Sequence, residues 1–370
     1  MKKVLAVLLA LVLVLTACGG NSANDDKPAE EPKPEDNTGT EDNNEDNNEN
    51  EGAAEEPVEN AGEIAKVGLG TTVSLGSSKG KADGGPLAQT DTTVAAVAFD
   101  ADGKIVKVII DTAQDKVMVN EDGTINQDTD WRSKKELGPD YNMKPTSEEV
   151  GIGKEWDEQV AFLEDYLVGK TADEFSAVEL DEGVPTDEDI LTGATIKIGS
   201  FQMAVADAWE NAQDVEGAVE IGLGISSALG GHSKDAEDGN GPVVQIEDNI
   251  SMIALDADGK IVASQTDVAQ NSVAFTEDLE LDGEYAEGTT KRQLGPDYNM
   301  KPTSEEVGIG KEWDEQAKAY DEWLMGKTAD DVAGIELEDG KATDEDLLAG
   351  ATITISDFVA ATTEAFEVTK

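Results

Sequence analysis

Cysteine and histidine are almost absent from this chain, which contains one Cys and one His among its 370 residues. A single cysteine cannot form an intramolecular disulfide, and no CxxCH segment is present for the attachment of a c-type haem. Zinc and iron sites of the usual kind need several Cys or His ligands. The sequence therefore predicts no metal centre built from these residues.

Basic residues are also scarce, because Lys and Arg together number 27 against 81 Asp and Glu, which gives a formal net charge of -54. Proteins that bind nucleic acid neutralise its phosphates with a basic surface, so this composition excludes nucleic acid as a partner. It also excludes adhesion to an anionic membrane surface by charge. The simplest role of the acidity is solubility and self-repulsion in an exterior medium.

The N-terminus has the pattern of an export signal over residues 1–17. Lys2 and Lys3 precede an apolar run, Val4–Leu15, that is too short for a membrane-spanning helix and is typical of a signal-peptide core. The ending Leu15-Thr-Ala-Cys18 resembles the bacterial lipobox. That resemblance implies a diacylglycerol on Cys18 and a protein anchored by lipid to the outer face of the cell membrane.

Residues 18–62, which follow the signal, are dominated by Asn, Asp, Glu, Pro and Gly and contain almost no large apolar side chain. Such a segment cannot bury enough surface to offset the entropy lost on ordering, and its like charges extend it. We therefore expect a disordered acidic linker between the lipid anchor and the folded part.

The remainder of the chain is a tandem duplication. Leu137–Gln159 reads LGPDYNMKPTSEEVGIGKEWDEQ, and Leu294–Gln316 repeats it letter for letter. Each copy has the length of a whole domain rather than of a solenoid repeat. We expect two homologous domains at 63–212 and 213–370, each of α+β class with an antiparallel sheet and helices packed beside it.

Within each copy the pattern changes from strands to helices. Two apolar runs around an Asp/Gly turn predict β-hairpins over 92–110 and 250–263. Apolar residues at helical spacing predict helices over 154–167 and its equivalent, a short helix over 171–177, and closing helices over 201–212 and 358–366. Alternating isoleucines predict short strands at 196–198 and 353–355.

A second repeated motif precedes each of these short strands. Asp189–Thr195 reads DILTGAT, and Asp346–Thr352 reads DLLAGAT, again 157 residues later. A threonine hydroxyl is a weak nucleophile, and no histidine lies nearby in the sequence to activate it, so modification of this residue requires an external enzyme. We expect the small residues before it to leave room for that enzyme and to allow a tight backbone: Gly193, Ala194, Gly350 and Ala351.

This motif resembles the acceptor sequence of flavin transferases, Asp-x-x-Ser/Thr-Gly-Ala-Thr. Together with the duplicated block, it is similar to the FMN-binding repeats of Gram-positive surface lipoproteins that carry out extracellular electron transfer. The resemblance implies covalent FMN on Thr195 and Thr352, with Asp189 and Asp346 recognised by the transferase. It also implies a membrane quinone or NADH dehydrogenase as electron donor, and ferric iron or another protein as acceptor. Ala349 departs from the Ser or Thr of the pattern.

Other side chains of the duplicated block are candidate flavin contacts. The aromatic and methionine residues are equally suited to the core: Tyr141, Met143, Trp156, Tyr298, Met300 and Trp313. Four lysines are candidates for the phosphate or are plain surface residues: Lys144, Lys154, Lys301 and Lys311.

The sequence thus favours an electron carrier without catalytic residues of its own. A reductase of an exported acceptor would need Arg or His beside the flavin, and the sequence contains no such motif. The main alternative is a non-redox surface lipoprotein that acts as a ligand-binding or cell-wall interaction module.

Overall fold

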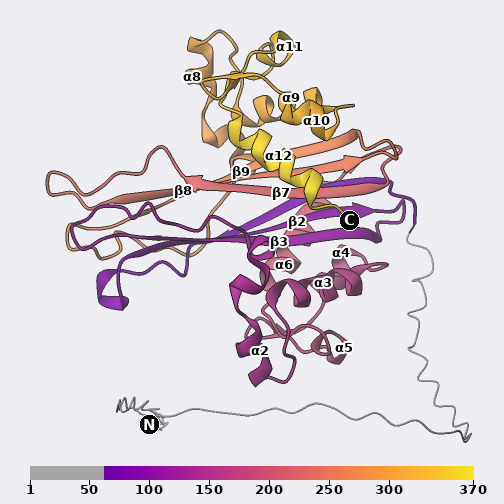
Figure 1. Ribbon diagram of the computed structural model, residues 1–370, viewed down its shortest axis with the longest axis horizontal. Helices are drawn as coiled ribbons and strands as arrows, with labels where there is room; N and C mark the ends of the chain where they lie inside the picture. The colour runs from indigo at the N-terminus through magenta and orange to yellow at the C-terminus, as the bar shows by residue number, and fades with distance from the viewer. Residues whose placement is uncertain (1–61) are drawn as a thin grey trace, which may run out of the picture. The chain divides into compact units, whose positions relative to one another are not determined.

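Helices and antiparallel sheets make up the folded part of the chain, as shown by a computed structural model that describes residues 62–370 (Figure 1). The predicted α+β class is confirmed. The predicted signal peptide, the lipidated Cys18 and linker residues 18–61 lie outside the described residues. Within residues 62–370, no helix has both the length and the apolar character needed to cross a membrane.

The sheet of the first repeat has the strand order β3-β2-β1-β6, with every neighbouring pair antiparallel. The predicted hairpin is present as β2 and β3, with β3 at one edge of the sheet, and it extends well beyond the predicted bounds. The strands of this sheet are β1 (Lys66–Ser74), β2 (Leu87–Phe99), β3 (Ile105–Met118) and β6 (Gln213–Asp214).

The sheet of the second repeat has the order β7-β8-β9 and is also antiparallel. Its strands are β7 (Glu220–Leu229), β8 (Val243–Leu255) and β9 (Ile261–Ala274). In each repeat, the last residues pair with the first strand of the sheet. In the first repeat β6 pairs with β1, and in the second Thr369 forms a bridge with Gly222 of β7. Small hairpins accompany the helices: β4 (Leu180–Asp181) with β5 (Val184–Pro185), and β10 (Leu337–Glu338) with β11 (Lys341–Ala342).

The helices follow one pattern in both repeats. The first repeat has α1 (Lys134–Leu137), α2 (Lys144–Glu149), α3 (Trp156–Leu167), α4 (Ala172–Ser176), α5 (Glu188–Leu191) and α6 (Gly199–Glu210). The second has α7 (Lys291–Leu294), α8 (Lys301–Glu306), α9 (Trp313–Leu324), α10 (Ala329–Ala333), α11 (Glu345–Leu348) and α12 (Ser356–Glu367). Single 3-10 turns occur at Lys81–Asp83, Gly138–Tyr141 and Gly295–Tyr298.

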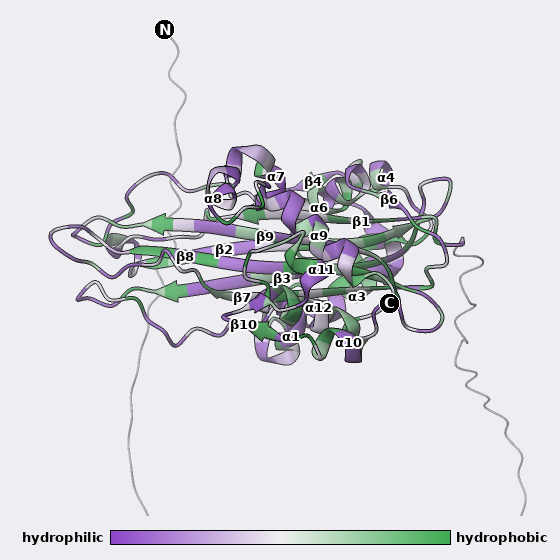
Figure 2. Ribbon diagram, turned by 90° about the horizontal axis from the view of Figure 1, so that it is seen from above, coloured by the Kyte–Doolittle hydropathy of each residue, from purple (hydrophilic) through white to green (hydrophobic). Residues whose placement is uncertain are grey.

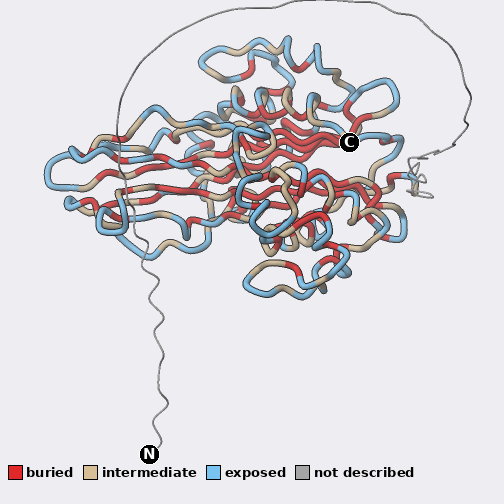
Figure 3. The backbone as a smooth tube through the Cα atoms, turned by 60° about the horizontal axis from the view of Figure 1, so that its bottom comes forward, coloured by how far each residue is buried: buried red, intermediate tan, exposed pale blue. Residues whose placement is uncertain are grey.

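The two repeats share buried layers between their sheets. Helices α3 and α6 cover the outer face of the first sheet, while α9 and α12 cover that of the second (Figure 1). The inner faces meet in two apolar clusters, one containing Val94 and Ile250 and the other containing Val117 and Val244. The strands are accordingly buried along most of their length, and exposure is concentrated in the loops (Figure 3).

The short strands predicted at 196–198 and 353–355 are wrong, because neither segment forms a ladder. The Ile198 and Ile355 N–H groups instead donate to the carbonyls of Gly183 (2.9 Å) and Gly340 (2.8 Å). Ile198 then takes the position that precedes α6, and Ile355 precedes α12 in the same way. The alternation of the isoleucines reflects burial of Ile198 and Ile355, which are each 1% exposed or less, within a connecting segment.

Candidate functional site

The DILTGAT motif forms a single helical turn that ends at the predicted acceptor. Asp187 caps α5, since its carboxylate accepts the N–H groups of Asp189 (2.9 Å) and Ile190 (3.3 Å). The turn closes when the Ala194 N–H donates to the Ile190 carbonyl at 2.8 Å, which places Thr195 immediately after it. Asp344 and α11 reproduce this arrangement before Thr352. A capped turn thus presents each threonine in a fixed position.

A buried glutamine holds the backbone of the predicted acceptor threonine in each repeat. The Gln159 side chain is 0% exposed, and its Oε1 accepts the Thr195 N–H at 2.9 Å and lies 3.4 Å from the Thr195 hydroxyl. Its Nε2 donates to the Lys154 carbonyl at 3.3 Å. Gln316 makes the same contacts with Thr352, at 3.0 and 3.4 Å. The sequence signal for this role was a glutamine within an otherwise apolar helical stripe, and our sequence analysis missed it.

The glycine of the motif is required by inward packing rather than by access for an enzyme. Gly193 and Ala194 are both buried, and a Cβ added to Gly193 would lie 2.1 Å from the Phe162 ring. At the equivalent position, a Cβ on Gly350 would lie 2.6 Å from the Cβ of Ala319. Our expectation that these small residues keep space free outside the protein is therefore corrected, since the close approach is to helices α3 and α9.

The predicted acceptor, Thr195, borders a cavity of about 390 Å³ in the first repeat. Thr195 is partly exposed there, and predicted contact residues Met143 and Trp156 line the same cavity. Apolar atoms make up most of the wall. The remaining lining residues are Lys134, Thr146, Ser147, Val150, Gln159, Val184, Ile196 and Lys197.

Two polar clamps hold the cavity wall that runs from Met143 to Glu155. The Glu155 carboxylate accepts the N–H groups of Met143 (2.8 Å) and Lys144 (3.1 Å), and the Ser147 hydroxyl donates to the Lys154 carbonyl at 2.6 Å. This wall also carries Val150, whose side chain is 66% exposed. The identical clamps in the second repeat come from Glu312 and Ser304.

The predicted aromatic contacts do not all reach the cavity. Tyr141 packs edge-on against Trp156 with ring centroids 6.4 Å apart, and its hydroxyl lies 3.4 Å from Gln114 Oε1. Trp156 is 2% exposed and offers the cavity only a small part of its ring. Tyr298 and Trp313 form the same pair at 6.5 Å. The tryptophans are therefore core residues that also border the site.

Lys134, which was not among the predicted site residues, lies over this aromatic pair. The Lys134 ammonium is 5.1 Å from the centroid of Tyr141 and 5.3 Å from that of Trp156, and it lines the cavity. Burial lowers its pKa, because the charged form is removed from water. Lys291 repeats this geometry at 5.2 and 5.5 Å, with its pKa lowered by the same cause. The usable signal was the recurrence of this lysine just ahead of each identical block.

The other predicted lysines take different positions. Lys144 and Lys301 are exposed, and only their backbone N–H groups are anchored. Lys154 Nζ lies 5.0 Å from the Phe162 ring, whereas Lys311 Nζ donates to the Gly350 carbonyl at 3.1 Å. The first repeat has Phe162 at the position where the second has Ala319. In the second repeat, Lys311 therefore reaches the turn that precedes Thr352.

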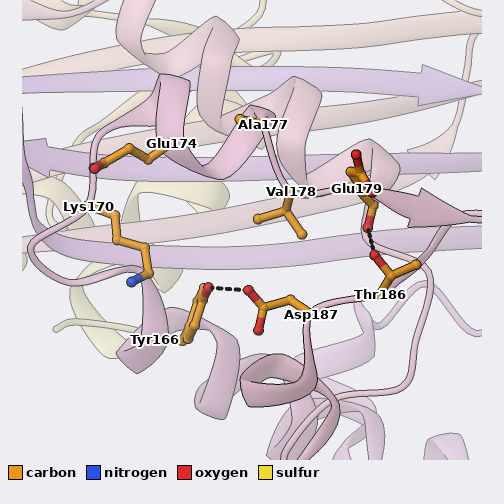
Figure 4. A pocket seen from close by; sticks show the side chains of 8 residues that line it. All are labelled: Tyr166, Lys170, Glu174, Ala177, Val178, Glu179, Thr186 and Asp187. Carbon is orange, nitrogen blue, oxygen red and sulfur yellow. Dashed lines mark hydrogen bonds between the residues drawn. The ribbon is translucent and has the colours of Figure 1, made fainter.

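A second cavity, of about 410 Å³, lies beside the cap of α5 and does not include Thr195. Figure 4 shows the Tyr166 hydroxyl directed at the Asp187 carboxylate, 3.3 Å away. Lys170 Nζ lies 4.2 Å from the Tyr166 ring centroid. Asp189 is exposed on the same short helix, as Asp346 is in the second repeat. This face is therefore acidic and accessible, in contrast to the apolar cavity at the threonine.

Among residues 62–370, no group of three or more His, Cys, Asp or Glu side chains is placed to hold a metal ion. Comparison of the whole chain with protein-family models, with curated proteins and with solved structures gave no match.

Proposed function

We propose that the protein is a membrane-anchored extracellular electron carrier with FMN bound covalently to Thr195 and Thr352. The observation that carries this proposal is the recurrence, in both repeats, of a partly exposed threonine fixed by a buried glutamine, with a lysine over the neighbouring Tyr–Trp pair. The carrier would relay electrons from a membrane quinone or NADH dehydrogenase system to ferric iron or another protein.

The residues present at Thr195 fit such a group. The cavity of about 390 Å³ falls within the usual range of ligand sites, roughly 300–1,000 Å³, and its wall is mainly apolar with a few polar groups. A neighbouring cavity of about 480 Å³ shares Lys134, Trp156 and Lys197 with it. Apolar walls suit a flat aromatic ring system, and lysines suit its phosphate or ring carbonyls.

Attachment requires a flavin transferase, because within residues 62–370 the Thr195 hydroxyl contacts the neutral Gln159 amide and no basic side chain. In the proposed step the Thr195 Oγ attacks the FMN phosphorus of FAD, a P–O bond forms, and the bond to AMP breaks. AMP leaves, and the transferase accepts the hydroxyl proton. The exposed Asp189 lies on α5, the short helix that precedes the threonine, which supports its role in recognition.

FMN, once bound, supplies reversible uptake of electrons. The protein's own residues would bind and orient it: Gln159 holds the backbone of the attachment point, and Met143 and Trp156 would exclude water on one side. Lys134, which lies over the Trp156 ring and lines the cavity, would supply a positive charge to a flavin bound there. Covalent attachment prevents loss of the flavin outside the cell, where a dissociated cofactor would be diluted without limit. Because the flavin would take up the electrons and the protein would only bind and orient it, these roles support a carrier rather than an enzyme.

The proposal is tested by the flavin absorbance of acid-denatured full-length protein made with and without a flavin transferase. We expect two flavins per chain with the transferase, one in each of Thr195→Ala and Thr352→Ala, and none in the double variant or without the enzyme. Colourless protein from a host that has the transferase would refute the proposal and favour the non-redox binding module.

A further inference from the structure

A polar layer interrupts the apolar core between the two sheets. On β3, Ala113 belongs to one apolar cluster and Val117 to the other, and Asp115 lies between them. On β8, Asp248 lies between Ile246 and Ile250 in the same way. Figure 2 shows strand segments changing from hydrophobic to hydrophilic and back along the sheets. Because residues two apart share a face of a strand, these carboxylates point into the space between the sheets.

Each carboxylate has a hydroxyl directly opposite it on the neighbouring strand. Thr90 pairs with Asp115 in the register of β2 and β3, and Ser227 pairs with Asp248 in that of β7 and β8. The Thr92 hydroxyl of the first sheet donates to the Asp248 carboxylate of the second. Four strands from both repeats therefore bring two carboxylates and three hydroxyls to one place.

Most of these oxygens have no hydrogen bond of ordinary length and angle, although Asp115, Asp248 and Ser227 lie close enough to interact with one another. Eight buried side-chain oxygens in residues 62–370 have no hydrogen-bond partner, and five of them are here: both oxygens of Asp115, one of Asp248, and the hydroxyls of Thr90 and Ser227. Asp115 and Asp248 are each 0% exposed. Such a concentration of unsatisfied oxygens at one site indicates a missing ligand rather than scattered defects.

The charge at this place is also uncompensated. Among the described residues, no basic side chain forms an ion pair with Asp115 or Asp248, and the other charged groups that act on them are the acidic Asp91 and Glu247. Burial raises the pKa of both carboxyls, and the proximity of Asp248 raises the pKa of Asp115 further. Two buried like charges require either a shared proton or a cation.

We propose that Asp115 and Asp248, with the hydroxyls of Thr90, Thr92 and Ser227, bind one Ca²⁺ ion between the two sheets. An all-oxygen set excludes soft metals and suits hard cations. The two carboxylates balance a divalent charge, and the five side chains offer seven oxygens, within the range of about six to eight that Ca²⁺ takes in irregular geometry. Mg²⁺ is less suited because it demands near-octahedral geometry and retains water.

The site occurs once per chain despite the duplication. At the equivalent positions, the second repeat has Asn271 in place of Asp115, and the first has Thr92 in place of Asp248. Asn271 is already satisfied by the backbone of Thr289, to which its amide donates at 3.1 Å. The expected stoichiometry is therefore one Ca²⁺ per chain, and the ion would join the first repeat to the second.

The test is Ca²⁺ titration by calorimetry of the full-length protein after removal of metals with EGTA. The protein is produced in a host without flavin transferase, so that the result does not depend on the proposed flavin. We expect one tight site per chain, lost in Asp248→Asn and in Asp115→Asn but retained in Glu247→Gln. The control removes one negative charge from the next residue of β8, whose side chain lies on the other face of the strand.

Thermal unfolding gives a second readout that weak surface binding would not reproduce. Ca²⁺ at about 100 times its Kd is expected to raise the wild-type Tm by about 5 °C. Asp248→Asn should be more stable than the wild type in EGTA and less stable in Ca²⁺, because it removes both the repulsion and the ion. The proposal would be overturned if the wild type and Asp248→Asn bound Ca²⁺ equally and the same one of the two proteins were the more stable in both EGTA and Ca²⁺. The two carboxyls would then be a pair that shares a proton.

Discussion

Replacing Gln159 with leucine tests how the acceptor threonine is held. The substitution removes the acceptor of the Thr195 N–H and the donor to the Lys154 carbonyl, which lie 2.9 and 3.3 Å from the Gln159 amide atoms. A buried backbone group without a partner costs about 1–3 kcal/mol. Because Thr195 is partly exposed and water can satisfy some of this loss, we expect a total destabilisation of about 2–4 kcal/mol.

The same substitution should impair flavin attachment at its own repeat alone. A misplacement of the hydroxyl that costs about 1.4 kcal/mol in the transfer step slows that step about tenfold. Urea unfolding followed by tryptophan fluorescence measures the stability, and timed peptide mass analysis during flavin transfer measures the modification rate of each threonine. Gln316→Leu is the matched control, because it should slow modification of Thr352 and leave Thr195 unaffected.

Equal slowing at both threonines in either variant would show that the loss is general unfolding rather than local positioning. Unchanged stability and unchanged rates in Gln159→Leu would refute the reasoning outright. Gln159→Glu adds a second check, since it retains the acceptor oxygen but places a charge in a fully buried site and should be the more damaging change.

Three further outcomes follow from the geometry. Gly193→Ala should abolish modification of Thr195, because its Cβ would lie 2.1 Å from the Phe162 ring, and adding Phe162→Ala should partly restore it in the same mass assay. Burial raises the pKa of Glu364 from 4.5 to about 8. The contribution of this group to the free energy of unfolding is therefore complete below about pH 4.5 and is lost as the pH rises through about 8. In Glu364→Gln, the free energy of unfolding measured with urea should fall less steeply between about pH 5 and 9 than in the wild type. An unchanged pH dependence would contradict the raised pKa of Glu364. Lys134→Met should lower the midpoint potential of the first repeat's flavin by on the order of 30 mV in a redox titration, and a rise would contradict the placement of this cation.

Much of the fold could be predicted because its strongest elements have regular periods. The helix that begins at Trp156 follows from apolar residues at helical spacing, and the capping box of Glu155 and Glu158 sets its start. The hairpin around Asp100–Gly103 follows from its turn, where Asp100 accepts the N–H groups of Asp102 and Lys104. The strands extend further than predicted because their polar residues are buried between the sheets, where tertiary packing outweighs local composition.

The site was less accessible to sequence reasoning. The duplicated motif made Thr195 a candidate, but local pattern could not show that Gln159, on a different helix, holds its backbone. The alternating Ile196 and Ile198 suggested a strand, although only three residues separate the acceptor from α6 and no partner strand lies beside them. Lys134 was missed because its importance depends on the aromatic rings beneath it, and those come together only in the folded chain.

The central claim is that each repeat carries one covalent flavin on a defined threonine, and its most direct test is the peptide mass map of the native protein. We predict that the peptides containing Thr195 and Thr352 each gain the mass of FMN less one water, and that fragmentation places the addition on the threonine. Unmodified peptides at both positions, from cells that possess the transferase, would contradict the account.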